Sequence, residues 1–132
     1  MAEATYPEGL LYHAEHDWAR IDQAQPDIAT LGITWYAQDA LGEVVFFEAP
    51  KPGSTLKQGD PYAEVESVKA VSDVIAPLSG EIVEVNSALE SDASAINEDP
   101  YGEGWLVKVR LSDSSEANSL MDAAAYIATL GG

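Results

Sequence analysis

Cysteine and basic residues are what this sequence most lacks. The 132 residues include no cysteine, and six lysines and arginines stand against 23 aspartates and glutamates, for a formal net charge of −17 at pH 7. Without cysteine there is no disulfide framework, no thiolate metal site and no catalytic thiol. Nucleic acids and anionic membranes are bound through clusters of Lys and Arg. We therefore expect neither as a partner.

Long apolar runs and the common catalytic motifs are also absent. No apolar stretch approaches the roughly 20 residues of a membrane span. The N-terminus has neither the basic nor the apolar segment of a targeting peptide. We therefore expect a bacterial cytoplasmic protein, or a mitochondrial matrix protein if the chain is a processed eukaryotic form. Phosphate-binding glycine loops, dinucleotide fingerprints and nucleophile elbows are missing, so we do not expect an enzyme.

What is present predicts a folded, mainly β chain. Hydrophobic residues make up 46 % of the sequence, enough for a core. The length fits a single domain over residues 1–132, with a core at about 12–111 and a C-terminal helix at about 114–130. Several short apolar runs separated by Gly and Pro are typical of a sandwich or barrel.

The pattern also places individual elements. The first strand falls at 10–12 or 18–21. Thr34 is suited to cap a short helix over Trp35–Leu41, which Gly42 would end. Further strands are predicted at 28–33, 44–47, 62–67, 72–75 and 105–111. Asp113 and Glu116 resemble a capping box for the terminal helix. The pattern Ala-Pro-x-x-Gly occurs at 49–53 and again at 76–80, each time after a strand, and indicates two related halves of one sandwich.

Lys69 is the residue that stands out. It lies in residues 68–71, the predicted tip of a hairpin. A lysine there is fixed at its base and free at its end, so a long cofactor attached to it would swing between distant active sites. The alternative is an ordinary surface lysine. Glu64 and Glu66 share a strand face with Tyr62 and are most simply a solvated face.

The segment around Lys69 resembles a known family. Residues 66–73, followed by 76–86, are similar to the lipoyl-lysine segment of the glycine cleavage system H protein family. Further motifs of that family are matched, in the right order, at residues 16–18, 32–42, 97–105 and 120–126. The resemblance covers about residues 12–126.

The resemblance implies a fold and a cofactor. The fold is a lipoyl/biotinyl-type β-sandwich (barrel-sandwich hybrid) with short helices and a C-terminal helix. Lys69 would carry lipoate in amide linkage, and Val68 and Ala70 favour lipoate because biotinyl segments usually flank the lysine with methionines. The residues that the modifying enzyme would recognise are Glu66, Val68, Ala70 and Gly80.

The resemblance also implies a monomeric substrate shuttle. Such a carrier receives the aminomethyl group of glycine from glycine decarboxylase, the pyridoxal-phosphate-dependent P-protein. It passes the group to aminomethyltransferase, the tetrahydrofolate-dependent T-protein, and its dithiol to dihydrolipoamide dehydrogenase, the L-protein. A lipoate-attaching enzyme is a fourth partner. The alternatives are an H-like protein that relays octanoyl or lipoyl groups to other enzymes, and a non-covalent β-sandwich adaptor.

The cargo itself implies an acidic cleft. Its amine is cationic, so carboxylates that line a cleft would hold it through charge-assisted hydrogen bonds. By resemblance the candidates are Asp73, then Asp17, then Glu15. For each the alternative is a solvated surface carboxylate, which is common in a chain this acidic. His13 and His16 receive no role, because a metal site needs further ligands.

Overall fold

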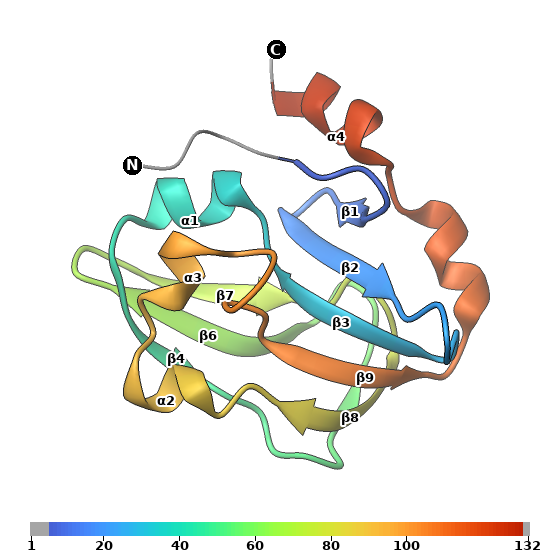
Figure 1. Ribbon diagram of the computed structural model, residues 1–132, viewed down its shortest axis with the longest axis horizontal. Helices are drawn as coiled ribbons and strands as arrows, with labels where there is room; N and C mark the ends of the chain where they lie inside the picture. The colour runs from blue at the N-terminus through green and yellow to red at the C-terminus, as the bar shows by residue number, and fades with distance from the viewer. Residues whose placement is uncertain (1–5, 131–132) are drawn as a thin grey trace.

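Two antiparallel sheets form the body of the protein. The computed structural model describes residues 6–130. The larger sheet has six strands (Figure 1). In spatial order these strands are β1 (Leu11–His13), β2 (Asp17–Ile21), β3 (Ile28–Ile33), β9 (Val107–Leu111), β8 (Gly80–Val85) and β5 (Thr55–Leu56). Both alternatives for the first strand are therefore strands, paired with each other as β1 and β2.

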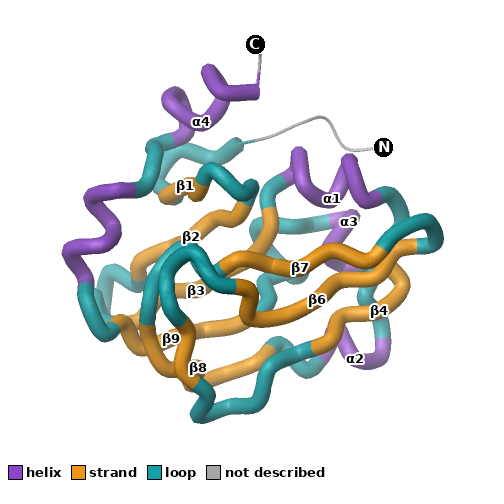
Figure 2. The backbone as a smooth tube through the Cα atoms, turned by 180° about the vertical axis from the view of Figure 1, so that it is seen from behind, coloured by secondary structure: helices purple, strands orange, loops and turns teal. Residues whose placement is uncertain are grey.

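The smaller sheet has three strands and covers the larger one. Its order is β4 (Val44–Glu48), β6 (Pro61–Ser67) and β7 (Val71–Ile75), as Figure 2 shows from behind. Val65 of β6 and Val74 of β7 point inward, and they pack with Leu31 and Val109 of the larger sheet in one buried core. This arrangement confirms the predicted mainly β sandwich.

The repeated pentapeptide marks two equivalent crossings between the sheets. The first copy follows β4 and leads to β5, and the second follows β7 and leads to β8. β5 and β8 then pair antiparallel, with Leu56 opposite Gly80. The two halves therefore leave one sheet and meet in the other, as the repeat predicts.

Short helices complete the fold. α1 (Trp35–Leu41) begins at Thr34, whose side chain accepts the Ala37 N–H, and ends at Gly42 with φ +82°. Both caps are as predicted. α2 (Ala88–Ser91) and α3 (Ala95–Glu98) follow β8 and close one end of the sandwich (Figure 1). No helix within residues 6–130 is long and apolar enough to cross a membrane.

The terminal helix departs from the prediction. Instead of one helix at 114–130, the chain forms the 3₁₀ helix η1 (Ser114–Ser119) and then α4 (Ala123–Leu130). Asp113 does cap η1, but Glu116 does not reach back to complete a capping box. Its carboxylate accepts the Ser79 N–H at 2.7 Å and the Ser79 hydroxyl at 2.8 Å. This tertiary contact draws the segment onto the sandwich before α4 begins.

A second cluster of buried aromatic side chains joins α4 to the larger sheet. The ring of Tyr126 on α4 stacks on Tyr12 of β1 at 4.8 Å. Trp18 of β2 is completely buried in the same cluster, and its indole N–H donates to the Pro100 carbonyl at 3.0 Å. Trp18 lies directly opposite Gly32 of β3. The Trp18 ring lies against Gly32, where there is no room for a side chain.

We expect Gly32→Ala to destabilise the protein by about 1–3 kcal/mol, the usual cost of overpacking a core. A Cβ at Gly32 would lie 2.6 Å from the Trp18 ring, which its hydrogen bond holds in place. Urea denaturation followed by tryptophan fluorescence measures the change. Val83→Ala, at an exposed position of β8, is the control and should stay within about 0.5 kcal/mol. Equal stability of the two variants would contradict the prediction.

Candidate functional site

Lys69 lies at the tip of the hairpin between β6 and β7, as predicted. The turn is closed by the Ser67 N–H, which donates to the Ala70 carbonyl at 2.8 Å. The Ser67 hydroxyl also accepts the N–H groups of Lys69 and Ala70, at 3.3 and 3.0 Å. The backbone beneath Lys69 is thus held by three hydrogen bonds, while its side chain is exposed.

The hairpin tip is also attached to the loop after α1. The Val68 N–H donates to the Glu43 carbonyl at 3.2 Å. Asn97 of α3 holds the same loop, because its side chain donates to the Gly42 carbonyl and accepts the Val44 N–H, both at 2.8 Å. The Lys69 stem passes close to Gly42, where an added Cβ would lie 3.4 Å from its Cε. That distance is an ordinary contact, so the glycine at position 42 is explained by its φ of +82° and not by the space that the lysine needs.

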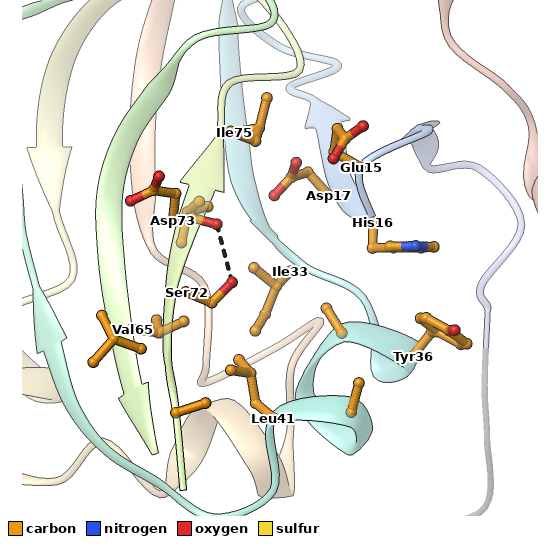
Figure 3. A pocket seen from close by; sticks show the side chains of 15 residues that line it. Glu15, His16, Asp17, Ile33, Tyr36, Leu41, Val65, Ser72, Asp73 and Ile75 are labelled. Atoms are coloured by element: carbon orange, nitrogen blue, oxygen red, sulfur yellow. Dashed lines mark hydrogen bonds between the residues drawn. The ribbon is translucent and has the colours of Figure 1, made fainter.

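A cleft of about 400 Å³ opens beside the hairpin, between α1, β7 and the turn that joins β1 to β2 (Figure 3). Its walls are partly apolar, with Ile33, Leu41 and Ile75 among them. Ala70 and Val71 line it as well, so the cleft begins right next to Lys69. An apolar chain attached to Lys69 has an apolar surface to lie on.

Asp17 is the buried carboxylate of this cleft. It is 1 % exposed, and its Oδ2 has no hydrogen-bond partner among the described residues. Figure 3 shows its carboxylate pointing into the cleft. Burial, and then the charge of Glu15, raise the pKa of Asp17 well above 3.8. A cation in the cleft would supply the missing partner and favour the ionised form.

Glu15 stands at the rim of the cleft, and the residue between it and Asp17 is held in an unusual conformation. His16 has φ +73°, the left-handed region that non-glycine residues rarely adopt. Its carbonyl accepts the Thr34 N–H at 3.1 Å, and its ring lies 4.4 Å from the Tyr36 ring. These contacts hold the turn so that Glu15 and Asp17 both line the cleft.

A chain of hydroxyl groups links this turn to α1 and α4. The Tyr126 hydroxyl lies 2.8 Å from His16 Nδ1 and 2.8 Å from the Thr34 hydroxyl. Burial lowers the pKa of His16, so its ring is neutral and Nδ1 is able to accept. The Tyr126 hydroxyl therefore bridges the Thr34 hydroxyl and His16 Nδ1 through two hydrogen bonds. His16 thus has a structural role that the sequence did not reveal.

Asp73 lies at the cleft but points away from it. It is directly opposite Glu64, which is opposite Glu48, so the three carboxylates form a row across the outer face of the smaller sheet. In Figure 3 the Asp73 carboxylate points to the side of β7 away from Asp17. Slight desolvation and then the charges of Glu48 and Asp73 raise the pKa of Glu64. The row is therefore a region of concentrated negative charge.

The residues expected to be read by the modifying enzyme divide into two groups. Val68, at 70 % exposed, and Ala70 lie at the hairpin tip beside Lys69, and Glu66 lies in β6 close to it. Gly80 is buried in β8, where an added Cβ would lie 2.3 Å from the Arg110 carbonyl oxygen. Packing alone therefore accounts for the glycine at position 80.

Tyr62 is a site residue that the strand pattern misplaced. Strict alternation put it on the solvated face with Glu64. A register shift between Pro61 and Ala63 instead turns it inward, where it packs against the core and buries its hydroxyl. Such an irregularity depends on pairing with β7, so no signal in the residues of β6 alone could have found it.

The groups of the site suit covalent attachment and binding. It offers an exposed amine on a rigid turn and a cleft with one buried carboxylate. Within residues 6–130, no group of three or more His, Asp or Glu side chains could hold a metal ion.

Comparison with known proteins gives one consistent match. The family model described as glycine cleavage H-protein matches residues 10–131. The H protein of Symbiobacterium thermophilum is 52 % identical over 123 residues, 93 % of this chain and 94 % of that protein. The H protein of Bacteroides thetaiotaomicron is 47 % identical over 96 % of this chain and 98 % of that protein.

A solved structure agrees with the sequence matches. The crystal structure of a glycine cleavage system H protein from Mycobacterium marinum matches with a TM-score of 0.86 and 43 % identity. The match covers 96 % of this chain and 99 % of that one. Sequence, fold and coverage lead to the same conclusion: the chain belongs to the glycine cleavage H-protein family.

Proposed function

We propose that Lys69 carries lipoate in amide linkage and that the cleft beside it shelters the cargo of the lipoyl arm. The observation that carries this proposal is the position of an exposed lysine, on a hydrogen-bonded turn, at the mouth of a cleft. The cleft contains a buried carboxylate with an oxygen that has no hydrogen-bond partner within residues 6–130. The residues fit the group, because its apolar chain and a cationic cargo both have a matching surface.

As a member of this family the chain is a lipoyl-carrying shuttle of the glycine cleavage system and not a catalyst. The lipoyl disulfide supplies the chemistry, because it accepts the aminomethyl group of glycine and later yields a dithiol. We propose that the enzymes that load, unload and reoxidise it are glycine decarboxylase, aminomethyltransferase and dihydrolipoamide dehydrogenase. Tethering gives the cargo a high effective concentration at each of them.

The residues of the cleft have different parts in this proposal. Asp17 binds the cationic amine through a charge-assisted hydrogen bond in a region of low polarity. Glu15 adds negative charge at the rim. Ile33 and Leu41 provide apolar contact that keeps water from the cargo. Asp73 lines the cleft but does not hold the amine, since its carboxylate faces the outer surface of β7.

The buried carboxylate of Asp17 also distinguishes between the two possible cargoes, the aminomethyl group of glycine cleavage and the octanoyl group of a lipoyl relay. An octanoyl group has no charge, and a carboxylate facing it would remain unpaired at a cost in free energy. Asp17 therefore favours a cationic cargo, and with it the glycine cleavage role.

The recognition surface and the setting complete the proposal. Glu66, Val68 and Ala70 contact the lipoate-attaching enzyme, whereas Gly80 acts through packing. The net charge of −17 speeds encounters with basic docking surfaces. We propose that the whole chain works as one monomeric carrier domain, and the bacterial relatives favour a cytoplasmic location.

Lipoylation should occur at Lys69 and at no other lysine. Protein from a lipoate-competent host should show one lipoyl-sized increment in intact mass, and Lys69→Arg should remove it completely, since the turn presents only this amine. Lys57→Arg, at an exposed lysine that follows β5, is the matched control and should keep the increment. An increment that persists in Lys69→Arg would disprove the attachment site.

Removal of the Asp17 charge should expose the cargo to hydrolysis. We expect Asp17→Asn to shorten the half-life of the loaded, isolated carrier at least about tenfold, because a hydrogen bond to a charged group is lost. Release of ammonia and formaldehyde measures the half-life. Asp73→Asn removes the same charge from the outer face and should change the half-life less than about twofold. Equal effects of both variants would remove Asp17 from the role.

The same variant should reveal the cost of burying Asp17 in the unmodified protein. The unfolded chain ionises near 3.8, whereas burial keeps the folded carboxyl protonated to higher pH. The free energy of unfolding of the wild type should therefore fall relative to that of Asp17→Asn as the pH rises above about 3.8. The loss is about 1.4 kcal/mol for each pH unit between the pKa of Asp17 in the unfolded chain and its pKa in the folded protein. Urea denaturation across the acidic and neutral range measures this. A difference independent of pH would contradict the buried ionisation.

A further inference from the structure

We propose that Tyr62 is a positioning residue of the cargo cleft: its hydroxyl donates a hydrogen bond to the Asp17 carboxylate and holds it ready for the cationic amine. The inference rests on the proposed function of the cleft and adds to it a residue from the opposite sheet. Its basis is the place of Tyr62 beside the strand residues that line the cleft, and two buried polar groups that have no hydrogen-bond partner among the described residues.

The first observation is the path of β6. Pro61 pairs with Ile75 and Ala63 with Val74, so the intervening Tyr62 has no counterpart on β7. A bulge of this kind re-aims a side chain, and such bulges often lie next to functional sites. The ring of Tyr62 packs against the core between the sheets, and its hydroxyl is buried.

The second observation is the coincidence of two unpartnered groups. Among the described residues, Asp17 Oδ2 and the Tyr62 hydroxyl are the only buried side-chain polar atoms without a hydrogen-bond partner. They come from β2 and β6, which belong to opposite sheets (Figure 2). Buried polar groups in proteins are nearly always paired. Pro61 and Ala63, on either side of Tyr62, pair with Ile75 and Val74, which line the cleft together with Asp17. Two such exceptions beside one cleft indicate a shared site.

The third observation is electrostatic. Burial, and then the charge of Asp17, raise the pKa of Tyr62 well above its ordinary value, so the two groups sense each other and the phenol keeps its proton. A protonated phenol is a donor, and an ionised carboxylate accepts at both oxygens. A small closing movement, or one bridging water, lets Tyr62 donate to Oδ2.

Other groups near Asp17 do not meet this need. Glu15, on the turn before β2, is an acceptor and repels the carboxylate. The Tyr126 hydroxyl of α4 senses Asp17 as well, but it is engaged between His16 and Thr34. Of these neighbours, Tyr62 has the donor that is not in use.

The test uses the unmodified chain, so that it does not depend on lipoylation. Proteins labelled with ¹³C at the aspartate carboxyl are titrated by NMR as wild type and as Tyr62→Phe. Loss of the donor should move the Asp17 titration midpoint to higher pH. Tyr12→Phe, whose hydroxyl donates instead to the Pro7 carbonyl, is the matched control and should leave the midpoint in place. An Asp17 midpoint that is unchanged or lowered in Tyr62→Phe overturns the proposal.

A second substitution guards against an effect of packing. Fluorination makes a phenol a stronger donor with little change in size, so 3-fluorotyrosine at position 62 should move the Asp17 midpoint to lower pH. Opposite shifts from the two substitutions support the hydrogen bond. Shifts in the same direction reflect packing alone and overturn it.

The loaded carrier separates this inference from the function on which it rests. Tyr62→Phe should shorten the half-life of the cargo roughly 3- to 10-fold, as expected for one hydrogen bond. It should have no further effect in the Asp17→Asn background, because both substitutions act through one carboxylate. An additive effect overturns the positioning role. If Asp17→Asn itself leaves the half-life unchanged, the proposed cleft fails instead, while the NMR result still decides the pairing.

Discussion

The site is built around a carboxylate that folding removes from water and for which the described part of the chain provides no hydrogen-bond partner at Oδ2. Asp17 begins β2, the strand that also carries the buried Trp18, so it cannot turn outward without disturbing the aromatic cluster. The surrounding structure provides the free energy that keeps it inside. Residues of both sheets and of α1 form the walls of the cleft, and the contacts of His16 support them. A protein interior tolerates such a group where a ligand is to complete it.

The second important feature is that the backbone of Lys69 is held in place while its side chain is free to move. Ser67 and the loop at Glu43 hold the backbone beneath Lys69, and Asn97 holds that loop in turn. The lysine side chain itself remains exposed. A cofactor on it would therefore start from a defined point and still reach distant partners. The cleft lies immediately beside this point, so a cofactor on Lys69 would need only a short movement to leave the cleft for a partner enzyme.

Sequence patterns located the parts of the site that are local. Thr34 and Gly42 delimit α1 because capping depends on the nearest few residues, and residues 68–71 form the hairpin tip because turn chemistry is equally local. They misplaced what depends on pairing. Tyr62 turns inward at a bulge, and the Glu116 carboxylate binds Ser79 and does not cap its own helix. Each of these outcomes is decided by a contact with a segment distant in the chain.

By itself the sequence determined the mainly β character, the position of Lys69 and the family resemblance, because apolar spacing, turn residues and motif order are properties of a linear chain. Glu15, Asp17 and Asp73, which the resemblance named, all line the cleft, but only the tertiary structure decided which of these carboxylates is buried. Alternation along a strand gives two faces but does not say which face meets another sheet, and a single bulge exchanges them. Asp17 and Tyr62 are far apart in sequence and stand on opposite sheets, which enclose one core only in the folded chain.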